Sequence, residues 1–138
     1  MKDTYTLRSE VAEGEGLTKW ILGVCTKYSL PRKVAFALQL CLDEAVANII
    51  EHGKRRGRGA TEISIYIARE DERIIMTVVD DGDEFDPTQF ESWQSWPSPD
   101  EPPVGGRGIR LMRKFASGLK YERLDQRNHL HFSFAVAG

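Results

Sequence analysis

Hydrophobic and polar positions change their period along the chain, and each period predicts an element. Residues 3–8 alternate polar and apolar, as a half-buried strand does. Over Val11–Tyr28, and again over Pro31–His52, apolar residues recur at the spacing of a helix that buries one face. Proline suits the first turn of the second helix, and Gly53 suits its end.

The next two segments predict a pair of strands. Thr61–Arg69 alternates with period two, and Arg73–Asp80 follows as a near-continuous apolar run. Such a run indicates an inner strand that is covered on both faces. Between them, the residues Glu70–Glu72 indicate a polar hairpin turn.

The last part of the chain begins with a long aperiodic segment. Residues 81–104 follow neither period and predict a loop, which at this length is typically a functional lid or disordered. A helix is predicted over about Gly105–Ala116, and strands over Leu119–Leu124 and His129–Val136. This order of elements predicts a mixed α/β layer fold, with one sheet and helices on one of its faces.

Composition narrows the class of protein. The chain has 138 residues, 41% hydrophobic and 29% charged, with a formal net charge of −2, so we expect one folded domain over residues 1–138. No apolar run approaches the roughly 20 residues of a membrane-spanning helix, and residues 1–10 lack the apolar stretch that is typical of a signal peptide. A cytoplasmic protein is therefore expected. Cys25 and Cys41 cannot make a disulfide framework and are expected as reduced, buried thiols.

A first polar group interrupts the second predicted helix. Glu44, Asn48 and His52 are spaced four residues apart and line one edge of that helix. An amide oxygen is a hard ligand for Mg²⁺, and a carboxylate can accept a proton from a hydroxyl or a water. The alternative is a solvated helix face, since this spacing is common by chance.

A second group follows the inner strand. Asp80 ends that strand and Gly82 follows it closely, which can hold a carboxylate at the wall of a pocket. Carboxylate oxygens only accept hydrogen bonds and suit an exocyclic amino group such as that of adenine, while glycine lets a flat ring approach the backbone. The alternative is that Asp-Gly makes only a turn.

A third group opens the last predicted helix. Gly105, Gly106 and Gly108 lead into this helix, and Arg107 and Arg110 can add positive charge. A helix start of this kind presents free N–H groups at the positive end of the dipole, which suits a phosphate. The chain has no P-loop pattern, and this segment lacks the third glycine of a dinucleotide fingerprint. The alternative is glycines that cap the helix for purely structural reasons.

Together and in this order, the three groups resemble the N, G1 and G2 boxes of the GHKL ATP-binding superfamily. The phrases DEAVANIIEHG, VVDDGDEFDP and GGRGIRLM look most like the bacterial anti-sigma-factor serine/threonine kinases. The resemblance covers essentially the whole chain. It implies a Bergerat-type α+β two-layer sandwich, with a mixed, mostly antiparallel sheet and helices on one face, that binds ATP and Mg²⁺. Residues 83–87 lack the second glycine of the superfamily pattern D-x-G-x-G, and the stand-alone kinase branch often has Phe-Asp-Pro there.

The resemblance also implies a role for each candidate residue. Glu44 is the expected general base for a serine or threonine hydroxyl, and Asn48 the expected Mg²⁺ ligand. Asp80 and Gly82 are expected at the adenine, and residues 83–104 as the lid. The other residues expected to bind ATP are His52, Gly105, Gly106, Arg107, Gly108 and Ile109, with Gly106 and Gly108 at the phosphates.

The partners expected from the resemblance are a STAS-type anti-sigma-factor antagonist, which the kinase phosphorylates, and a sigma factor, which it binds. A homodimer and transcription regulation by partner switching are also implied. Two other functions stay open. One is a non-catalytic, nucleotide-dependent module that captures or releases a partner protein. The other is the catalytic half of a sensor histidine kinase, which is disfavoured because no dimerising helix or phospho-acceptor histidine precedes the ATP domain.

Three further features have no role in this scheme. Residues 54–58 are basic but lack the interleaved aromatic residues of a nucleic-acid arm, so we expect a solvated helix-to-strand connection. His129 and His131 alternate on a predicted strand with no Cys or His cluster nearby, so no zinc site is expected. Trp93 and Trp96 either anchor a partner or pack back on the domain.

Overall fold

A computed structural model describes residues 2–8, 14–56, 62–89 and 106–136. The strands in this part of the chain are β1 (Lys2–Arg8), β2 (Glu62–Glu70), β3 (Arg73–Asp80), β4 (Gly118–Leu124) and β5 (Arg127–Ala135). The helices are α1 (Gly14–Lys27), α2 (Arg32–Arg56), α3 (Gly106–Phe115) and the short 3₁₀ helix η1 (Pro87–Gln89).

The strands form one five-stranded sheet in the order β1-β2-β3-β5-β4, and every neighbouring pair is antiparallel. β2 and β3 are joined by a two-residue turn, in which Asp71 takes the left-handed conformation with φ 56°. The register places Ile65 opposite Val78, and Val78 opposite Leu130. Opposite residues share a face, so this register gathers the apolar positions of neighbouring strands on one side of the sheet.

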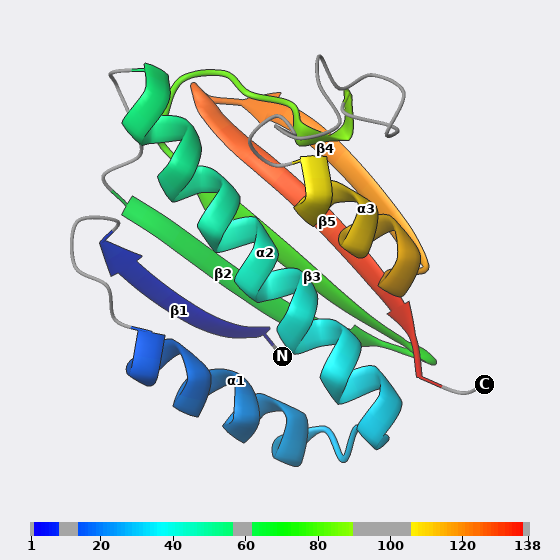
Figure 1. The fold of residues 1–138 in the computed structure, drawn as a ribbon. Coiled ribbons are helices and arrows are strands. Elements are labelled where there is room, and N and C mark those ends of the chain that lie inside the picture. The colour runs from blue at the N-terminus through cyan, green and yellow to red at the C-terminus, as the bar shows by residue number, and fades with distance from the viewer. Residues whose placement is uncertain (1, 9–13, 57–61, 90–105, 137–138) are drawn as a thin grey trace.

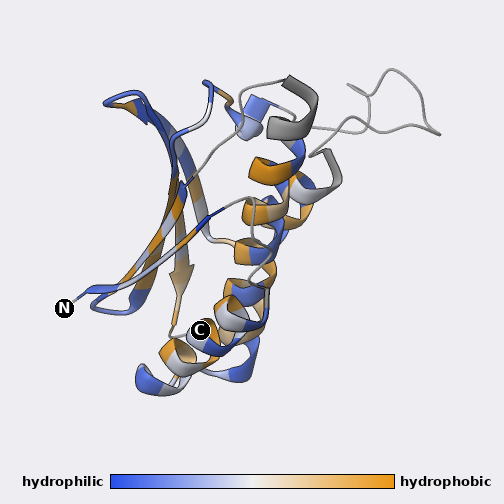
Figure 2. Cartoon of the chain, turned by 90° about the vertical axis from the view of Figure 1, so that its left-hand side faces the viewer, coloured by the Kyte–Doolittle hydropathy of each residue, from blue (hydrophilic) through white to orange (hydrophobic). Residues whose placement is uncertain are grey.

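The helices form a second layer on that apolar face. α2 runs across the face of the sheet, with α1 beside β1 and α3 near β4 and β5 (Figure 1). Viewed from the side, the helices lie on one side of the sheet and the hydrophobic positions meet between the layers (Figure 2). The predicted fold class is therefore confirmed. The core includes the fully buried side chains Leu38, Leu42, Ile65, Met76, Met112 and Phe132.

Both cysteines are free and buried, as the sequence predicts. Cys41 has no exposed surface, and its burial, together with the nearby Glu44 carboxylate, raises the pKa of the thiol to about 12. This thiol stays protonated at neutral pH and behaves as a small apolar side chain of the core.

The predicted end of the second helix is wrong. α2 runs through His52 and Gly53 to Arg56. A glycine inside a helix costs only about 1 kcal/mol relative to alanine, and the basic residues that follow it favour a helix C-terminus, where the dipole is negative. Residues 54–56 therefore belong to α2 and not to a connection, and residues 57 and 58 lie outside the described residues.

The prediction that β3 is covered on both faces is also wrong. β3 is an inner strand, between β2 and β5, but the helices lie on only one side of it (Figure 2). On its other face, Ile75 and Thr77 are half-buried. Neighbouring strands shelter an inner strand from both sides, so an apolar side chain is tolerated there without a covering helix.

The junction between α1 and α2 begins with a left-handed residue. Ser29 has φ 51°, and its N–H donates to the carbonyl of Thr26 while the N–H of Leu30 donates to the carbonyl of Cys25, both at 3.0 Å. This is the Schellman arrangement, which satisfies the last carbonyl groups of a helix. It explains why the helical pattern breaks at Ser29 although no glycine stands there.

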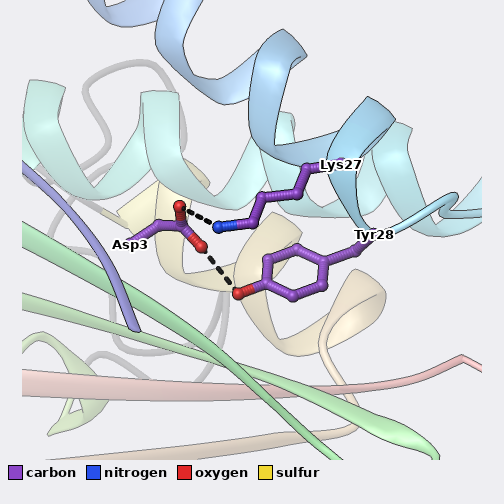
Figure 3. A network of polar contacts seen from close by, with 3 residues as sticks. All are labelled: Asp3, Lys27 and Tyr28. Carbon is purple, nitrogen blue, oxygen red and sulfur yellow. Dashed lines mark hydrogen bonds and ion pairs between the residues drawn. The ribbon is translucent and has the colours of Figure 1, made fainter. Parts of the chain in front are cut away.

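A polar network fixes β1 to the end of α1 (Figure 3). One carboxylate oxygen of Asp3 accepts a hydrogen bond from Lys27 Nζ at 2.9 Å, and the other accepts one from the Tyr28 hydroxyl at 2.6 Å. The hydrogen bond from Tyr28, and to a lesser degree that from Lys27, lowers the pKa of Asp3. The hydrogen bond to Asp3 also raises the pKa of Tyr28 to about 12. The network stabilises the edge strand through its ionised carboxylate.

Candidate functional site

Asp80 is the last residue of β3 and lies on the face of the sheet that the helices cover. The register places it opposite Ile63 on one side and Asn128 on the other. Its side chain is only 6% exposed, and its Oδ1 accepts hydrogen bonds from the Gly82 N–H at 2.9 Å and from Asn128 Nδ2 at 3.0 Å. No hydrogen bond from the described residues reaches Oδ2, so this oxygen can accept one from a ligand.

Burial and hydrogen bonding act on Asp80 in opposite directions. Desolvation raises the pKa of the carboxyl, while the hydrogen bonds from Asn128 and Gly82 lower it, and burial is the larger effect. A carboxylate held in a dry position costs folding free energy unless it has partners. Such a group is a candidate for binding rather than for stability.

A small pocket opens between this end of the sheet and α2. Its volume is about 20 Å³, which is far smaller than a purine base. Asp80 and Asn48 both line it, and the apolar side chains around them would cover the faces of a flat ring. The complete lining is Ala45, Asn48, Ile49, Val78, Asp80, Phe85, Pro87, Tyr121, Asn128 and Leu130.

Asn48 and Glu44 lie one turn apart on α2, as the sequence predicts. Asn48 is 6% exposed, and its carboxamide forms no hydrogen bond to any residue that the structure describes. Asn48 lines the pocket beside Asp80, so its carboxamide lies where a ligand could contact the oxygen. Glu44 is half-buried, and it contacts the start of α3.

The contact between Glu44 and α3 depends on a glycine. A Cβ at Gly108 would lie 2.7 Å from Glu44 Oε2, so any larger residue would displace the carboxylate. Gly106 and Arg107 form the first turn of α3, whose leading N–H groups have no partner within the helix. Ile109 follows on this turn, and its side chain is fully buried in the hydrophobic core. The structure thus brings Glu44 of the first polar group into contact with Gly108 of the third group.

Several other predicted residues lie wholly or partly outside the described part of the chain. His52 lies on α2, and its side chain is outside the described part of the chain, as is all of Gly105. Of the expected lid, residues 83–89 are described and contain η1, while Trp93 and Trp96 lie outside the described residues. The carbonyl of Thr88 accepts a hydrogen bond from Arg113 at 2.7 Å, which ties the start of this segment to α3.

No cluster of three or more His, Cys, Asp or Glu side chains that could hold a metal ion occurs in the described ranges. His131 lies on the open face of the sheet, where Nδ1 is 2.9 Å from Thr77 Oγ1 and Nε2 is 2.8 Å from Glu122 Oε1. None of the helices in the described part of the chain is long and apolar enough to span a bilayer.

Three polar residues near Asp80 were not predicted from the sequence, and they are Asn128, Tyr121 and Arg123. Asn128 is 6% exposed and bonds to Asp80, Tyr121 and Arg123. A signal for Asn128 was present, because it continues the inward-facing alternation of Leu130 on β5 and so places a polar side chain where the pattern expects an apolar one. Tyr121 and Arg123 gave no such signal.

This chain is similar to known proteins over most of its length. Residues 7–134 match the family profile described as histidine kinase-like ATPase domain. The chain is also 32% identical over 128 residues to the serine/threonine-protein kinase BtrW of Bordetella bronchiseptica. That match covers 93% of this chain and 89% of the relative. The five-stranded antiparallel sheet with helices on one face is consistent with that family.

Proposed function

The chain belongs to the family of histidine kinase-like ATPase domains, and from this premise we propose that it is an ATP-dependent serine/threonine protein kinase. The relative of 32% identity is named a serine/threonine-protein kinase, and its match with this chain covers most of both proteins. The observation that carries the proposal is the buried Asp80 carboxylate, with one oxygen held by the protein and the other left for a ligand.

Asp80 recognises the base in this proposal. Its Oδ2 accepts a hydrogen bond from the exocyclic amino group of adenine, and the buried Gly82 leaves room for the ring beside the backbone. Apolar side chains such as Ile49 and Val78 cover the ring faces. Because the pocket is small, side chains of its lining move outward when the base enters, while the backbone of residues 82–85 stays anchored.

The phosphates lie at the start of α3. The N–H groups of Gly106 and Gly108 point along the helix axis at its positive end, and Arg107 belongs to the same turn. Asn48 supplies a carboxamide oxygen from the pocket wall, and such an oxygen is a hard ligand that suits Mg²⁺. When bound, Mg²⁺ neutralises part of the phosphate charge.

Glu44 is the proposed general base. Its half-buried carboxylate contacts Gly108 at the start of α3, so it lies beside the proposed phosphate site. It accepts the proton of a serine or threonine hydroxyl as that oxygen bonds to the γ-phosphorus and the bond to the β-γ bridging oxygen breaks. The products are a phosphoprotein, ADP and a proton held first by Glu44.

The proposed protein substrate is a STAS-type anti-sigma-factor antagonist, and the proposed second partner is a sigma factor. The support is the resemblance of the three motif phrases to the bacterial anti-sigma kinases, together with the kinase name of the relative. In such a partner switch the chain regulates transcription in the cytoplasm, as a homodimer.

Phosphate transfer from labelled ATP to a cognate STAS protein tests the function. Glu44→Gln should abolish transfer while calorimetry with a non-hydrolysable ATP analogue still detects binding. Asp43→Asn is the matched control, because Asp43 is an exposed carboxylate on the adjacent position of α2 and should transfer at the wild-type rate. Undiminished transfer by Glu44→Gln would exclude Glu44 as the base. Binding without transfer to any partner would favour the non-catalytic module.

A further inference from the structure

A group of polar side chains from β4 and β5 surrounds Asp80 and was not part of the motif pattern. At its centre, Asn128 uses both protons of Nδ2, donating one to Asp80 Oδ1 at 3.0 Å and one to the carbonyl of Asp83 at 2.9 Å. Its Oδ1 accepts from the Phe85 N–H at 3.2 Å, from Arg123 Nη1 at 3.1 Å and from the Tyr121 hydroxyl.

This pattern leaves Asn128 with no free hydrogen-bonding group for a ligand. Both donors are used, and its oxygen accepts three hydrogen bonds. The orientation of the amide is also fixed, because turning it over would set its oxygen against two acceptors and its NH₂ against three donors. Asn128 is therefore suited to holding other groups rather than to touching a nucleotide.

Arg123 completes the arrangement from the neighbouring strand. Its Nη1 donates to the carbonyl of Gly82 at 2.8 Å as well as to Asn128 Oδ1. Asn128 and Arg123 stand opposite each other in the register of β4 and β5, so the sheet itself fixes their spacing. Together they hold the carboxylate of Asp80 and the backbone of residues 82–85 in one geometry.

We propose that Asn128 is a positioning residue for base selection: it occupies Oδ1 of Asp80 and anchors the backbone of 83–85, so that Oδ2 alone faces the base. The inference rests on the proposed ATP site. Its consequence is selectivity for a purine that carries a 6-amino group, because only that group donates to Oδ2. Arg123 acts through Asn128 and does not contact the base.

The test compares ATP with purine riboside 5′-triphosphate, which lacks the amino group, by calorimetry in the presence of Mg²⁺. Wild-type protein should bind ATP about 10- to 100-fold more tightly than the analogue. Asn128→Asp replaces the donor by an oxygen that repels Asp80. This variant should lose most of the preference for ATP over the analogue, while its affinity for the analogue changes less than about threefold. Gln126→Glu is the matched control, because Gln126 is exposed two residues away and gains the same charge.

A second readout needs no nucleotide. Amide hydrogen exchange of Gly82, whose N–H donates to Asp80 Oδ1, should be faster in Asn128→Asp than in wild type, and unchanged in Gln126→Glu. If Asn128→Asp does not fold, Arg123→Gln decides, because it keeps Asn128 but removes one of the donors that fix it. That variant should show a smaller loss of the same selective kind.

The possible results distinguish a failure of the positioning role of Asn128 from a failure of the proposed ATP site. An equal loss of affinity for both nucleotides, or an unchanged ratio in a folded Asn128→Asp, would overturn the positioning role while leaving the ATP site intact. Wild-type protein that binds neither nucleotide would instead overturn the proposed function, and the inference would fall with it.

Discussion

Replacing Asp80 by asparagine should weaken ATP binding but stabilise the protein without nucleotide. The reason is that the buried carboxylate favours ATP binding and costs folding free energy. Asparagine has the same shape, and its oxygen can still accept from Gly82 and Asn128, which bond to Oδ1 at 2.9 and 3.0 Å. The atom at the position of Oδ2 becomes an NH₂ donor and faces the amino group of the base. A hydrogen bond to a charged acceptor is worth about 1.5–3 kcal/mol, so we expect ATP affinity to fall about 10- to 150-fold.

The stability of the protein without nucleotide should change in the other direction. Burial raises the pKa of Asp80 in the folded state above the unfolded value of 3.8. A carboxyl with a raised folded pKa destabilises the fold at pH values above that pKa, and the penalty disappears as the pH falls below the unfolded pKa. Asp80→Asn should therefore raise the melting temperature at pH 7, and this gain should shrink toward pH 4.

The assay is calorimetric titration with a non-hydrolysable ATP analogue, paired with thermal unfolding followed by circular dichroism from pH 7 to pH 4. Asp83→Asn is a suitable control, because Asp83 accepts a hydrogen bond from Asn128 through its backbone carbonyl, which the substitution keeps. Tight binding by Asp80→Asn would refute the assignment of the adenine site. Loss of stability at pH 7 would refute the argument that the buried charge is costly.

Three further outcomes follow from the packing. Gly108→Ala should reduce phosphate transfer, measured with labelled ATP, more than it reduces nucleotide binding, because the new Cβ would lie 2.7 Å from Glu44 Oε2. Transfer at the wild-type rate would contradict this contact. Asp3→Asn should cost about 1 kcal/mol at pH 7 by urea unfolding. This cost should shrink as the pH falls below the unfolded value of 3.8, and disappear once the pH is below the lowered pKa of Asp3 in the folded protein. Met112→Ala, with no exposed surface, should lower the free energy of unfolding by about 2–5 kcal/mol, and a change under 1 kcal/mol would contradict its core position.

Local patterns predicted most of the elements. The limits of β3 over Arg73–Asp80 agree with the predicted strand, because alternation and apolar runs reflect burial that is repeated at every residue. The end of α2 was missed because a single glycine is a weak stop signal when basic helix-forming residues follow it. The end of α1 at Ser29 uses a left-handed serine, which no composition rule would choose over glycine.

By itself, the sequence determined the fold class and the three motif groups, since periodicity and motif order are properties of neighbouring residues. Only the tertiary structure decided that Gly108 packs on Glu44, and that Asn128 and Arg123 hold Asp80 and the backbone after it. Those contacts join α2 to α3, and β3 to β4 and β5, across long separations in the chain. Register and helix packing set them, and neither is encoded in the period of any one segment.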